Sequence, residues 1–591
     1  MDVTPSSFPD GQAHARLRPE ATDATRYLCA AAHLDETFAR AVLDEVLHQP
    51  HRAIAPSHGI SLGPVIRHSL AARRRSLVRD GLVAAVLILG LVASRPVGVG
   101  VLLILLAAWL IVRALRMWSE RRAAASLAYL IVALVLVAGI VGGSGALTYA
   151  LYGPSYYGFP GEGVAPVRAS IWVVLLLMIW GTCFAYRLVV HRTIAVELTP
   201  EAYDPRRAPA LDRVHQRHLD YIEQAQRGNV TVYSQENGRP FIGFGAVTEQ
   251  WSLVTPLKSA AAAAQQIYPA DDGYRNTNTS LAVSDAAEAV PFTIDQLYEA
   301  IRTGMAELAD PRLPEDEVVP HLSVRDRVFV AGTLPINSPF LDQGQPLSRL
   351  SEPEIKEVQR TVRGRLRHYQ SVRMAAWGGE LEVTTFLHAT QRGRMLYVEF
   401  IATVVPGIRS AYHRIDTYDR LDAAAAVRAA GRAVGDVIRS PLALVAVPAA
   451  GVAKIRRALN ESSDAKRISR QLMFDYGCRT SVRELAADFA NPAPFQPYDA
   501  NERVSVIERR LLQILVSFLE EHGYDVADLA GQVANVINNS TNINNNTVNN
   551  GNFVTGSTLT NSPVVAGSSA SANVNTGTKS AAPSPVAGRA T

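Results

Sequence analysis

Few residues in this chain have the types and spacing that could carry chemistry. His321, Ser323 and Asp326 are close in sequence and include the three side-chain types of a hydrolytic triad. Such residues are also common in a loop that leads into a strand, and a triad is recognised by its geometry in space. The sequence has no HExxH, Walker A, nucleophile-elbow, CxxC, EF-hand or kinase signature. We therefore predict no catalytic residue; the sequence favours a protein that is not an enzyme without excluding one.

Metal ligands at usable spacing are equally sparse. His48 and His51 are three residues apart, but Pro50 lies between them and no further ligand is close in sequence. His215 and His218 have a helical spacing, and that spacing is their only metal-like feature. We therefore predict no metal site. The cysteines are too scattered for a zinc site or a disulfide framework: Cys29, Cys183 and Cys478.

One glycine-containing segment resembles part of a phosphate-binding loop. Residues 240–245 read Pro-Phe-Ile-Gly-Phe-Gly, with glycines at positions 243 and 245. Nucleotide-binding loops also need a third glycine or a following lysine at a fixed spacing, together with the start of a helix, and this sequence has neither. A strand, a tight turn and a second strand is the better interpretation. We therefore predict no cofactor.

Charge and hydrophobicity point to a membrane. The chain has 58 Lys and Arg against 54 Asp and Glu, which gives a formal charge of +4. This excess is small for 591 residues and argues against a large basic face that binds nucleic acid. Hydrophobic residues make up 48% of the chain and are concentrated between positions 81 and 190. The sequence thus predicts an integral membrane protein without a nucleic-acid partner.

Four membrane spans are expected in this region. Its first apolar run is interrupted only by Arg95 and Pro96. A single helix through that run would be about 48 Å long, too long for a hydrocarbon core of ~30 Å. We therefore expect two short passes joined at these residues, then two longer spans. The predicted spans are 81–94, 97–112, 126–151 and 169–190.

Arginine clusters predict the orientation. They lie at 73–79, 113–122 and 187–192, and positive residues are enriched on the cytoplasmic side of membrane proteins. We therefore expect a multi-pass protein of the cytoplasmic (plasma) membrane with both termini in the cytoplasm. The span interiors contain no Asp, Glu, Lys or His, which weakens a transporter interpretation because ion-coupled transport usually needs ionisable groups there.

Two glycines in the third predicted span are candidate interaction residues. Gly139 and Gly143 form a small-xxx-small pair that lets another helix approach closely. Self-association of two chains and packing within one four-helix bundle explain the pair equally well. Both alternatives remain open.

The soluble parts divide by composition. We expect residues 1–20 to be disordered and 21–80 to form a small helical module on the cytoplasmic side. Residues 191–420 mix helix and strand patterns and predict a cytoplasmic α+β domain with an antiparallel sheet. Its clearest strands, 381–389 and 395–405, form a hairpin. The other expected elements are helices at 35–48, 208–226, 293–308, 354–374 and 499–523, and strands at 229–234 and 328–331.

A helical region is predicted at 421–534, with an apolar segment at 441–453. That segment is interrupted by Pro448 and is too short to span a membrane. It could lie on the membrane surface, with basic residues near anionic headgroups, or be buried in the soluble domain. Both readings remain open. The flanking basic residues are Arg428, Arg432, Arg439, Lys454, Arg456 and Arg457.

The tail 535–591 has low complexity and is rich in Asn, Ser and Thr. Its apolar residues Ile543, Val548 and Phe553 recur at intervals of five, and asparagine ladders between them suit stacked β structure. A disordered tail is the alternative. These three residues are the tail's candidate interaction positions.

The sequence carries short motifs at 27–32, 51–53, 240–245, 251–252, 377–381, 507–510 and 518–523. Together they resemble motifs of a group of uncharacterised actinobacterial multi-spanning membrane proteins with a large cytoplasmic domain and an Asn/Ser/Thr-rich tail. The resemblance covers most of the chain up to about residue 530, and it implies a source without implying an activity. The tail also looks like short amyloid-type signalling segments of some bacterial proteins.

Together these features favour an interaction or signalling protein of the membrane. The expected partners are the lipid bilayer, a second copy through the spans or the tail, and an unidentified cytoplasmic protein. A transporter or channel component is the alternative, and an enzyme at the inner leaflet is a third reading.

Overall fold

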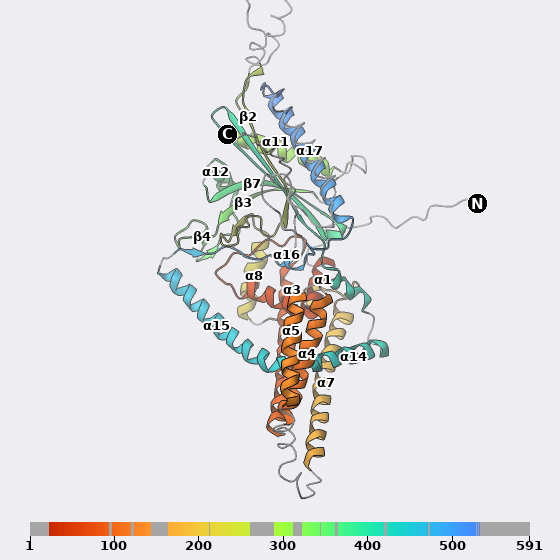
Figure 1. Ribbon diagram of the computed structural model, residues 1–591. Helices are drawn as coiled ribbons and strands as arrows, with labels where there is room; N and C mark the ends of the chain where they lie inside the picture. Colours follow the sequence, from red (N-terminus) through yellow and green to blue (C-terminus); the bar gives the residue numbers. More distant parts are fainter. Residues whose placement is uncertain are drawn as a thin grey trace, which may run out of the picture.

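A computed structural model describes most of the chain between residues 23 and 531. It contains a bundle of apolar helices, a domain built on a β-sheet, and a layer of short helices between them (Figure 1). The described residues are 23–93, 97–119, 123–142, 164–211, 213–260, 289–310, 312, 319, 322–342, 344–360, 364–418, 422–470, 473–527, 529 and 531.

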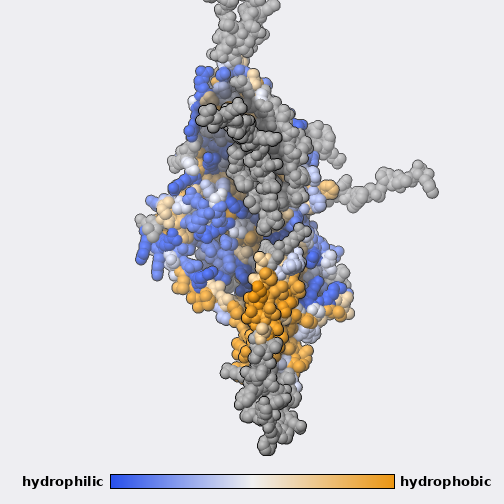
Figure 2. Space-filling model, viewed as in Figure 1, coloured by the Kyte–Doolittle hydropathy of each residue, from blue (hydrophilic) through white to orange (hydrophobic). Residues whose placement is uncertain are grey.

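The chain is a membrane protein. Four helical stretches are long and apolar enough to cross a bilayer: Leu62–Ala93, Gly98–Ser119, Ser170–Glu197 and Ala423–Ser469, the last of which contains two helices joined by a 3₁₀ turn. Hydrophobic residues gather on the surface of the bundle, and hydrophilic residues cover much of the sheet domain (Figure 2). The bundle helices are α3 (Leu62–Ala93), α4 (Val97–Ser119), α5 (Ala123–Gly142) and α7 (Val164–Glu197).

Two of the bundle helices extend well beyond the predicted spans. The first span was expected to begin at residue 81, but α3 begins at Leu62, and α7 continues past residue 190 to Glu197. The extra turns are polar on one side, so an apolar run does not reveal them. No helix-breaking residue separates them from the apolar part, and Leu62, Val65 and Ile66 are almost fully buried. Each helix is therefore continuous from the bundle into the soluble part.

The third predicted span and the segment 441–453 differ from expectation. α5 has a described apolar stretch of only 124–138, and residues 143–151 lie outside the described residues. In contrast, Pro448 does not interrupt a helix: it lies inside α15 (Ala443–Ser469). It is the sixth residue of α15, so the missing N–H removes a single bond near the helix start.

The apolar stretch Ala423–Ser469 contains two helices that do not run parallel to the bundle. α14 (Ala423–Arg439) lies across the bundle and contacts α7 and α4. A 3₁₀ turn, η8 (Ser440–Leu442), joins it to α15, which slants away toward the sheet domain (Figure 1).

The soluble domain is built on a six-stranded sheet in the order β1-β3-β7-β8-β9-β2. All neighbouring pairs are antiparallel except β1 with β3, which are parallel, so the expected antiparallel sheet is confirmed with one parallel edge. The expected hairpin is formed by β8 and β9. The strands are β1 (Val230–Tyr233), β2 (Ala246–Pro256), β3 (Ser323–Ala331), β7 (Leu366–Ala376), β8 (Leu381–Arg392) and β9 (Met395–Val405).

Helices cover one face of this sheet. α11 (Ile294–Ala306) and α17 (Gln496–Glu521) pack on it and form the largest hydrophobic core with the inward residues of β7, β8 and β9. The helix predicted at 293–308 forms as α11, and Thr293 and Gln296 make a capping box at its start. The helix predicted at 499–523 also forms, although α17 begins three residues before Asp499.

One predicted helix is wrong. The basic stretch 354–374 divides into α12 (Glu352–Arg360) and the central strand β7. Buried polar side chains conceal the alternation of that strand: His368 and Gln370 lie on its helix-covered face, where Gln370 donates a hydrogen bond to the carbonyl of Tyr298 at 2.9 Å. In sequence these polar positions resemble a solvated helix.

The other face of the sheet is covered by the segment 240–245. Its Phe244 packs with Phe329, Tyr369 and Phe386 in an aromatic cluster. The segment forms a turn before β2, and no described strand precedes β2 within it, unlike the strand-turn-strand prediction. The backbone N–H groups of Gly243 and Gly245 both donate to one carboxylate oxygen of Glu484, at 2.7 and 3.0 Å. These donors, which a phosphate loop would offer to a ligand, therefore already have a protein partner.

A set of short helices, here called the collar, joins the sheet domain to the bundle. It consists of α1 (Asp23–Leu34), α2 (Glu36–Val42), α8 (Arg213–Gln226), α13 (Ser410–His413) and α16 (Val482–Ala486). Their apolar side chains form one core with both the first turns of α3 and the last turns of α7.

Polar contacts reinforce the collar. Arg26 of α1 donates to the carbonyl of Leu198 just after α7 and pairs with Asp416 at 2.8 Å. Fully buried Arg483 of α16 donates to the carbonyls of Glu380 and Pro406 in the sheet domain. The collar therefore connects the bundle to the sheet domain by both apolar and polar contacts.

The remaining elements are short connections. They are β4 (Thr333–Leu334), β5 (Leu341–Asp342), β6 (Gln345–Pro346) and β10 (Phe474–Asp475), with β10 pairing β4 and β5 pairing β6, and the helical turns η2 (Leu43–Leu47), η4 (Pro205–Arg207), η5 (Glu307–Ala309), η6 (Trp377–Gly379) and η7 (Arg414–Thr417).

The turn before β2 predicts a sharp sensitivity to a single methyl group. Gly245 has φ +93°, and a Cβ there would lie 2.1 Å from the carbonyl oxygen of Val404. Gly379 has nearly the same φ, +90°, but open space around it. We expect Gly245→Ala to lower the free energy of unfolding by about 1–3 kcal/mol more than Gly379→Ala, because only the first adds overpacking to backbone strain. Thermal melting of the two variants in detergent measures the difference, and equal melting temperatures would contradict the packing described.

Candidate functional site

The residues singled out from sequence do not form a catalytic or metal site in the described part of the chain. Asp326 of β3 accepts a hydrogen bond from His368 at 2.9 Å and pairs with Arg302 at 2.7 Å, while His321 lies outside the described residues. Among the described residues, no group of three or more His, Cys, Asp or Glu is placed to hold a metal ion.

The candidate interaction residues are only partly within reach of the structure. Gly139, the first glycine of the predicted small-xxx-small pair, lies in α5. The others lie outside the described residues: Gly143, Ile543, Val548 and Phe553.

A pair of carboxyl groups, one half-buried and one buried, is a feature that the sequence did not reveal. Glu249 of β2 forms a hydrogen bond with Glu508 of α17, and Glu508 also accepts a bond from the indole of Trp251 at 2.7 Å. Burial, followed by the charge of Glu508, raises the pKa of Glu249 well above its ordinary range. The two groups therefore share a proton between sheet and helix.

The carboxyl pair predicts a pH-dependent stability. Because the pKa of Glu249 is raised on folding, the folded state binds the extra proton between the ordinary glutamate pKa and the raised value. The stability from this group is therefore complete at low pH and falls as pH rises, by up to about 1.4 kcal/mol per pH unit. Melting temperatures between about pH 5 and pH 8 should decline less in Glu249→Gln than in the wild type.

The control for this test is Glu520→Gln, which removes an exposed carboxylate from the same helix as Glu508. It should retain the pH dependence of the wild type. A Glu249→Gln variant with an unchanged pH profile would show that the pair does not share a proton.

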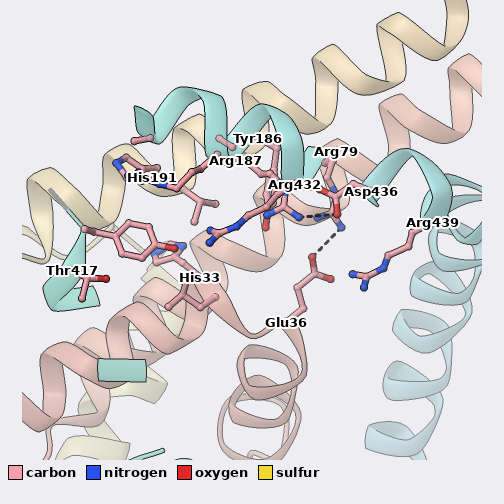
Figure 3. Close-up of a pocket in the computed structure, with 16 residues that line it drawn as sticks. His33, Glu36, Arg79, Tyr186, Arg187, His191, Thr417, Arg432, Asp436 and Arg439 are labelled. Carbon is pink, nitrogen blue, oxygen red and sulfur yellow. Dashed lines mark hydrogen bonds and ion pairs between the residues drawn. The ribbon is translucent and has the colours of Figure 1, made fainter. Parts of the chain in front are cut away.

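A larger feature is a cavity at the junction of the bundle and the collar, here called the arginine cavity. Its volume is about 740 Å³, and it is lined by the end of α1, the start of α2, α3, α7, the turn η7 and α14 (Figure 3). Arg79 is two residues before the apolar run of α3, and Arg187 is near the end of the apolar part of α7. The cavity thus lies where the apolar surface of the bundle meets the polar part.

Two of its arginines are held by carboxylates. Arg187 forms a bidentate pair with Asp436 of α14, at 2.6 and 2.8 Å, and this pair fixes α14 to α7. Arg79 pairs with Glu36 at 2.9 Å and with Asp80 at 2.7 Å. These pairs use both carboxylates that line the cavity, Glu36 and Asp436.

Three more arginines, all on α14, line the same cavity. Arg428, Arg432 and Arg439 have exposed side chains, and no described carboxylate pairs with any of them. In Figure 3, Arg432 and Arg439 point from α14 toward the side of Glu36 and His33. The spacing of i, i+4 and i+11 places all three on one face of α14. The cavity therefore has a surplus of positive charge.

His33 adds a neutral polar group to the lining. Its side chain is 5% exposed, and its Nε2 contacts Nδ1 of His68 at 3.1 Å. Burial, followed by the neighbouring His68 and Arg75, lowers the pKa of His33 to about 3, so the ring is uncharged at neutral pH. Its Nδ1 is buried and has no hydrogen-bond partner among the described residues.

The cavity can bind an anion but has no described nucleophile paired with a base. Arginine binds phosphate and carboxylate oxygens through a planar fork of donors. The sequence contained part of this signal, because Arg428, Arg432 and Arg439 were recognised as basic residues beside an apolar segment. The sequence did not reveal that these arginines lie beside α3 and α7, because that arrangement depends on tertiary packing.

The pair that fixes α14 predicts a local loosening on mutation. Asp436→Asn should leave half-buried Arg187 without its carboxylate and weaken the docking of α14 by about 1–3 kcal/mol. Hydrogen exchange of the α14 amides should then become faster. Glu461→Gln, an exposed carboxylate on α15, is the control and should leave exchange in α14 unchanged. Equal protection of α14 in wild type and Asp436→Asn would contradict the docking role of the pair.

Comparison with known proteins identifies one family. Residues 250–554 match the model of a family described as the AbeC-like domain, and these residues make up just over half of the chain. No curated protein matches the chain. No solved structure matches it either.

Proposed function

The chain belongs to the AbeC-like domain family, and we propose that it is an interaction or signalling protein of the cytoplasmic membrane. In this proposal the bundle anchors the protein, and the sheet domain and the tail after it lie in the cytoplasm with both chain termini. The observation that carries the proposal is the continuity of α3 and α7 from the bundle into the collar core.

This continuity supports signalling because it joins two environments in one packed body. A tilt or shift of α3 or α7 in the bilayer must move the collar, since the ends of both helices are buried in the same hydrophobic core. The collar in turn contacts the sheet domain through Arg483. A soluble domain that was merely tethered would need neither the long helices nor the shared core.

The course of α17 supports a role for the tail in meeting partners. α17 leads from the collar side of the sheet domain toward the end farthest from the bundle (Figure 1). It ends at Glu521, beside the bridge between Ser259 and Tyr524. The last described residues of the chain therefore lie at the end of the sheet domain farthest from the bundle. We propose that the tail assembles with a second tail through its apolar positions.

The orientation rests on charge. Unpaired arginines of α14 lie at the same level as Arg79 and Arg187, on the side of the bundle that carries the sheet domain. Arginines at this boundary favour the cytoplasmic side. This supports a cytoplasmic location for the sheet domain.

A seeding experiment tests the proposed assembly. Full-length protein in nanodiscs is incubated with preformed aggregates of a peptide covering residues 531–562. We expect the wild type to form assemblies with the ~4.7 Å spacing of stacked strands, because the peptide offers a template for the same segment. A variant with Ile543→Ser, Val548→Ser and Phe553→Ser keeps the length and the asparagines and should not assemble.

Two outcomes would contradict the proposal. Wild type and the triple variant could both remain dispersed, which would reduce the tail to a solvated extension. Alternatively, the reconstituted protein could conduct ions or solutes equally well with and without residues 535–591, which would favour the transporter or channel reading.

A further inference from the structure

We propose that the arginine cavity binds the phosphate group of an anionic phospholipid, with the acyl chains lying along the apolar face of α14. The inference goes beyond the proposed function, because it assigns a ligand class and a binding site to the membrane boundary. It rests on the charge of the cavity, on its depth in the membrane and on α14, which has one face packed on the bundle, one basic face and one exposed apolar face.

The charge balance of the cavity favours an anion. Five arginines line it against two carboxylates, and both carboxylates are already engaged with Arg79 and Arg187. Three arginines therefore converge on a space without a described counter-charge. A phosphodiester supplies negative oxygens that match the arginine fork, and a cavity of about 740 Å³ is large enough for a headgroup.

The depth of the cavity favours a ligand from the bilayer. Arg79 and Arg187 each lie at the point where an apolar helical segment meets polar residues. That is the level of lipid headgroups in a membrane whose core covers the apolar segments. Basic pockets between membrane helices on the cytoplasmic side are known sites for acidic headgroups.

The faces of α14 distinguish a lipid from a soluble phosphate. One face packs on the bundle through fully buried Ala433, and a second presents the arginines to the cavity. A third face exposes Val427 and Val434, which are 70% and 54% exposed. A helix that lies at a membrane surface has such an exposed apolar face beside a basic one. Only a lipid can contact both faces at once, with acyl chains on the valines and its phosphate on the arginines.

His33 provides an independent sign of a ligand. Its buried Nδ1 has no described partner, although buried polar atoms normally have one. A neutral imidazole can donate a hydrogen bond to a phosphate oxygen when the proton is on this nitrogen, in which case Nε2 accepts from Nδ1 of His68. The ring lies among the residues that line the cavity (Figure 3).

The test compares lipid binding in matched charge variants of the full chain. The cavity variant carries Arg428→Gln, Arg432→Gln and Arg439→Gln. The control carries Arg392→Gln, Arg394→Gln and Arg509→Gln, which removes the same charge from exposed positions of the sheet domain. Native mass spectrometry from detergent measures retention of phosphatidylglycerol against phosphatidylcholine.

We expect wild type and control to retain phosphatidylglycerol preferentially, and the cavity variant to bind it about tenfold to hundredfold more weakly. Should the triple variant fail to fold, Arg432→Gln alone should weaken binding about fivefold. Equal lipid preference in the cavity and control variants would overturn the proposal.

A second arm separates the two sources of phosphate. Inorganic phosphate and glycerophosphate, which lack acyl chains, are added to the wild type with bound phosphatidylglycerol. Retention of the lipid at equal concentrations of competitor supports a lipid site. The lipid assignment would be overturned in favour of a soluble phosphate if either compound displaced the lipid. It would also be overturned if either compound bound the wild type as tightly as the lipid does.

Discussion

The structure depends on the burial of the ends of two membrane helices in a soluble core. Leu62, Val65 and Ile66 at the start of α3 share a hydrophobic cluster with Ile194 at the end of α7 and with Leu198 just after it. Each buried aliphatic side chain of this kind contributes about 1.5–3 kcal/mol, so the cluster opposes separation of the collar from the bundle. This packing is one of the links that join the bundle to the sheet domain; α15, which contacts both α3 and β10, is another.

The same packing determines where charge is placed. Because α3 and α7 continue upward from the apolar segments, Arg79 and Arg187 are positioned at the boundary, where they can pair with Glu36 of α2 and Asp436 of α14. These pairs hold a collar helix and a crossing helix at one level. The arginines of α14 are then the only members of the cavity lining, among the described residues, that carry charge without a described opposite partner.

Much of the fold could be predicted from the sequence, because its signals are local. The hairpin of β8 and β9 and the helix α11 depend on patterns of neighbouring residues, and both were expected. β7 was missed because buried Gln370 and His368 take their partners from distant elements or across the sheet. The polar first turns of α3 were missed for a related reason, since their apolar contacts come from the collar.

The candidate site was less predictable than the fold. The arginines of α14 were visible in the sequence, but their cavity is formed by residues from α1, α3 and α7 that are hundreds of positions away. The pair of Glu249 and Glu508 is likewise a contact between distant segments. No local pattern records that two carboxyl groups will share a buried site.

The central claim is that bundle and sheet domain move as one body through α3 and α7. Pulsed electron paramagnetic resonance tests this claim directly, by measuring the distance between spin labels attached at Val92→Cys on α3 and Glu502→Cys on α17. The native cysteines are all buried, which limits competing labelling. We predict one narrow distance distribution that is the same in detergent and in nanodiscs. A broad or multiple distribution would contradict the claim and would indicate a hinge between the membrane helices and the soluble domain.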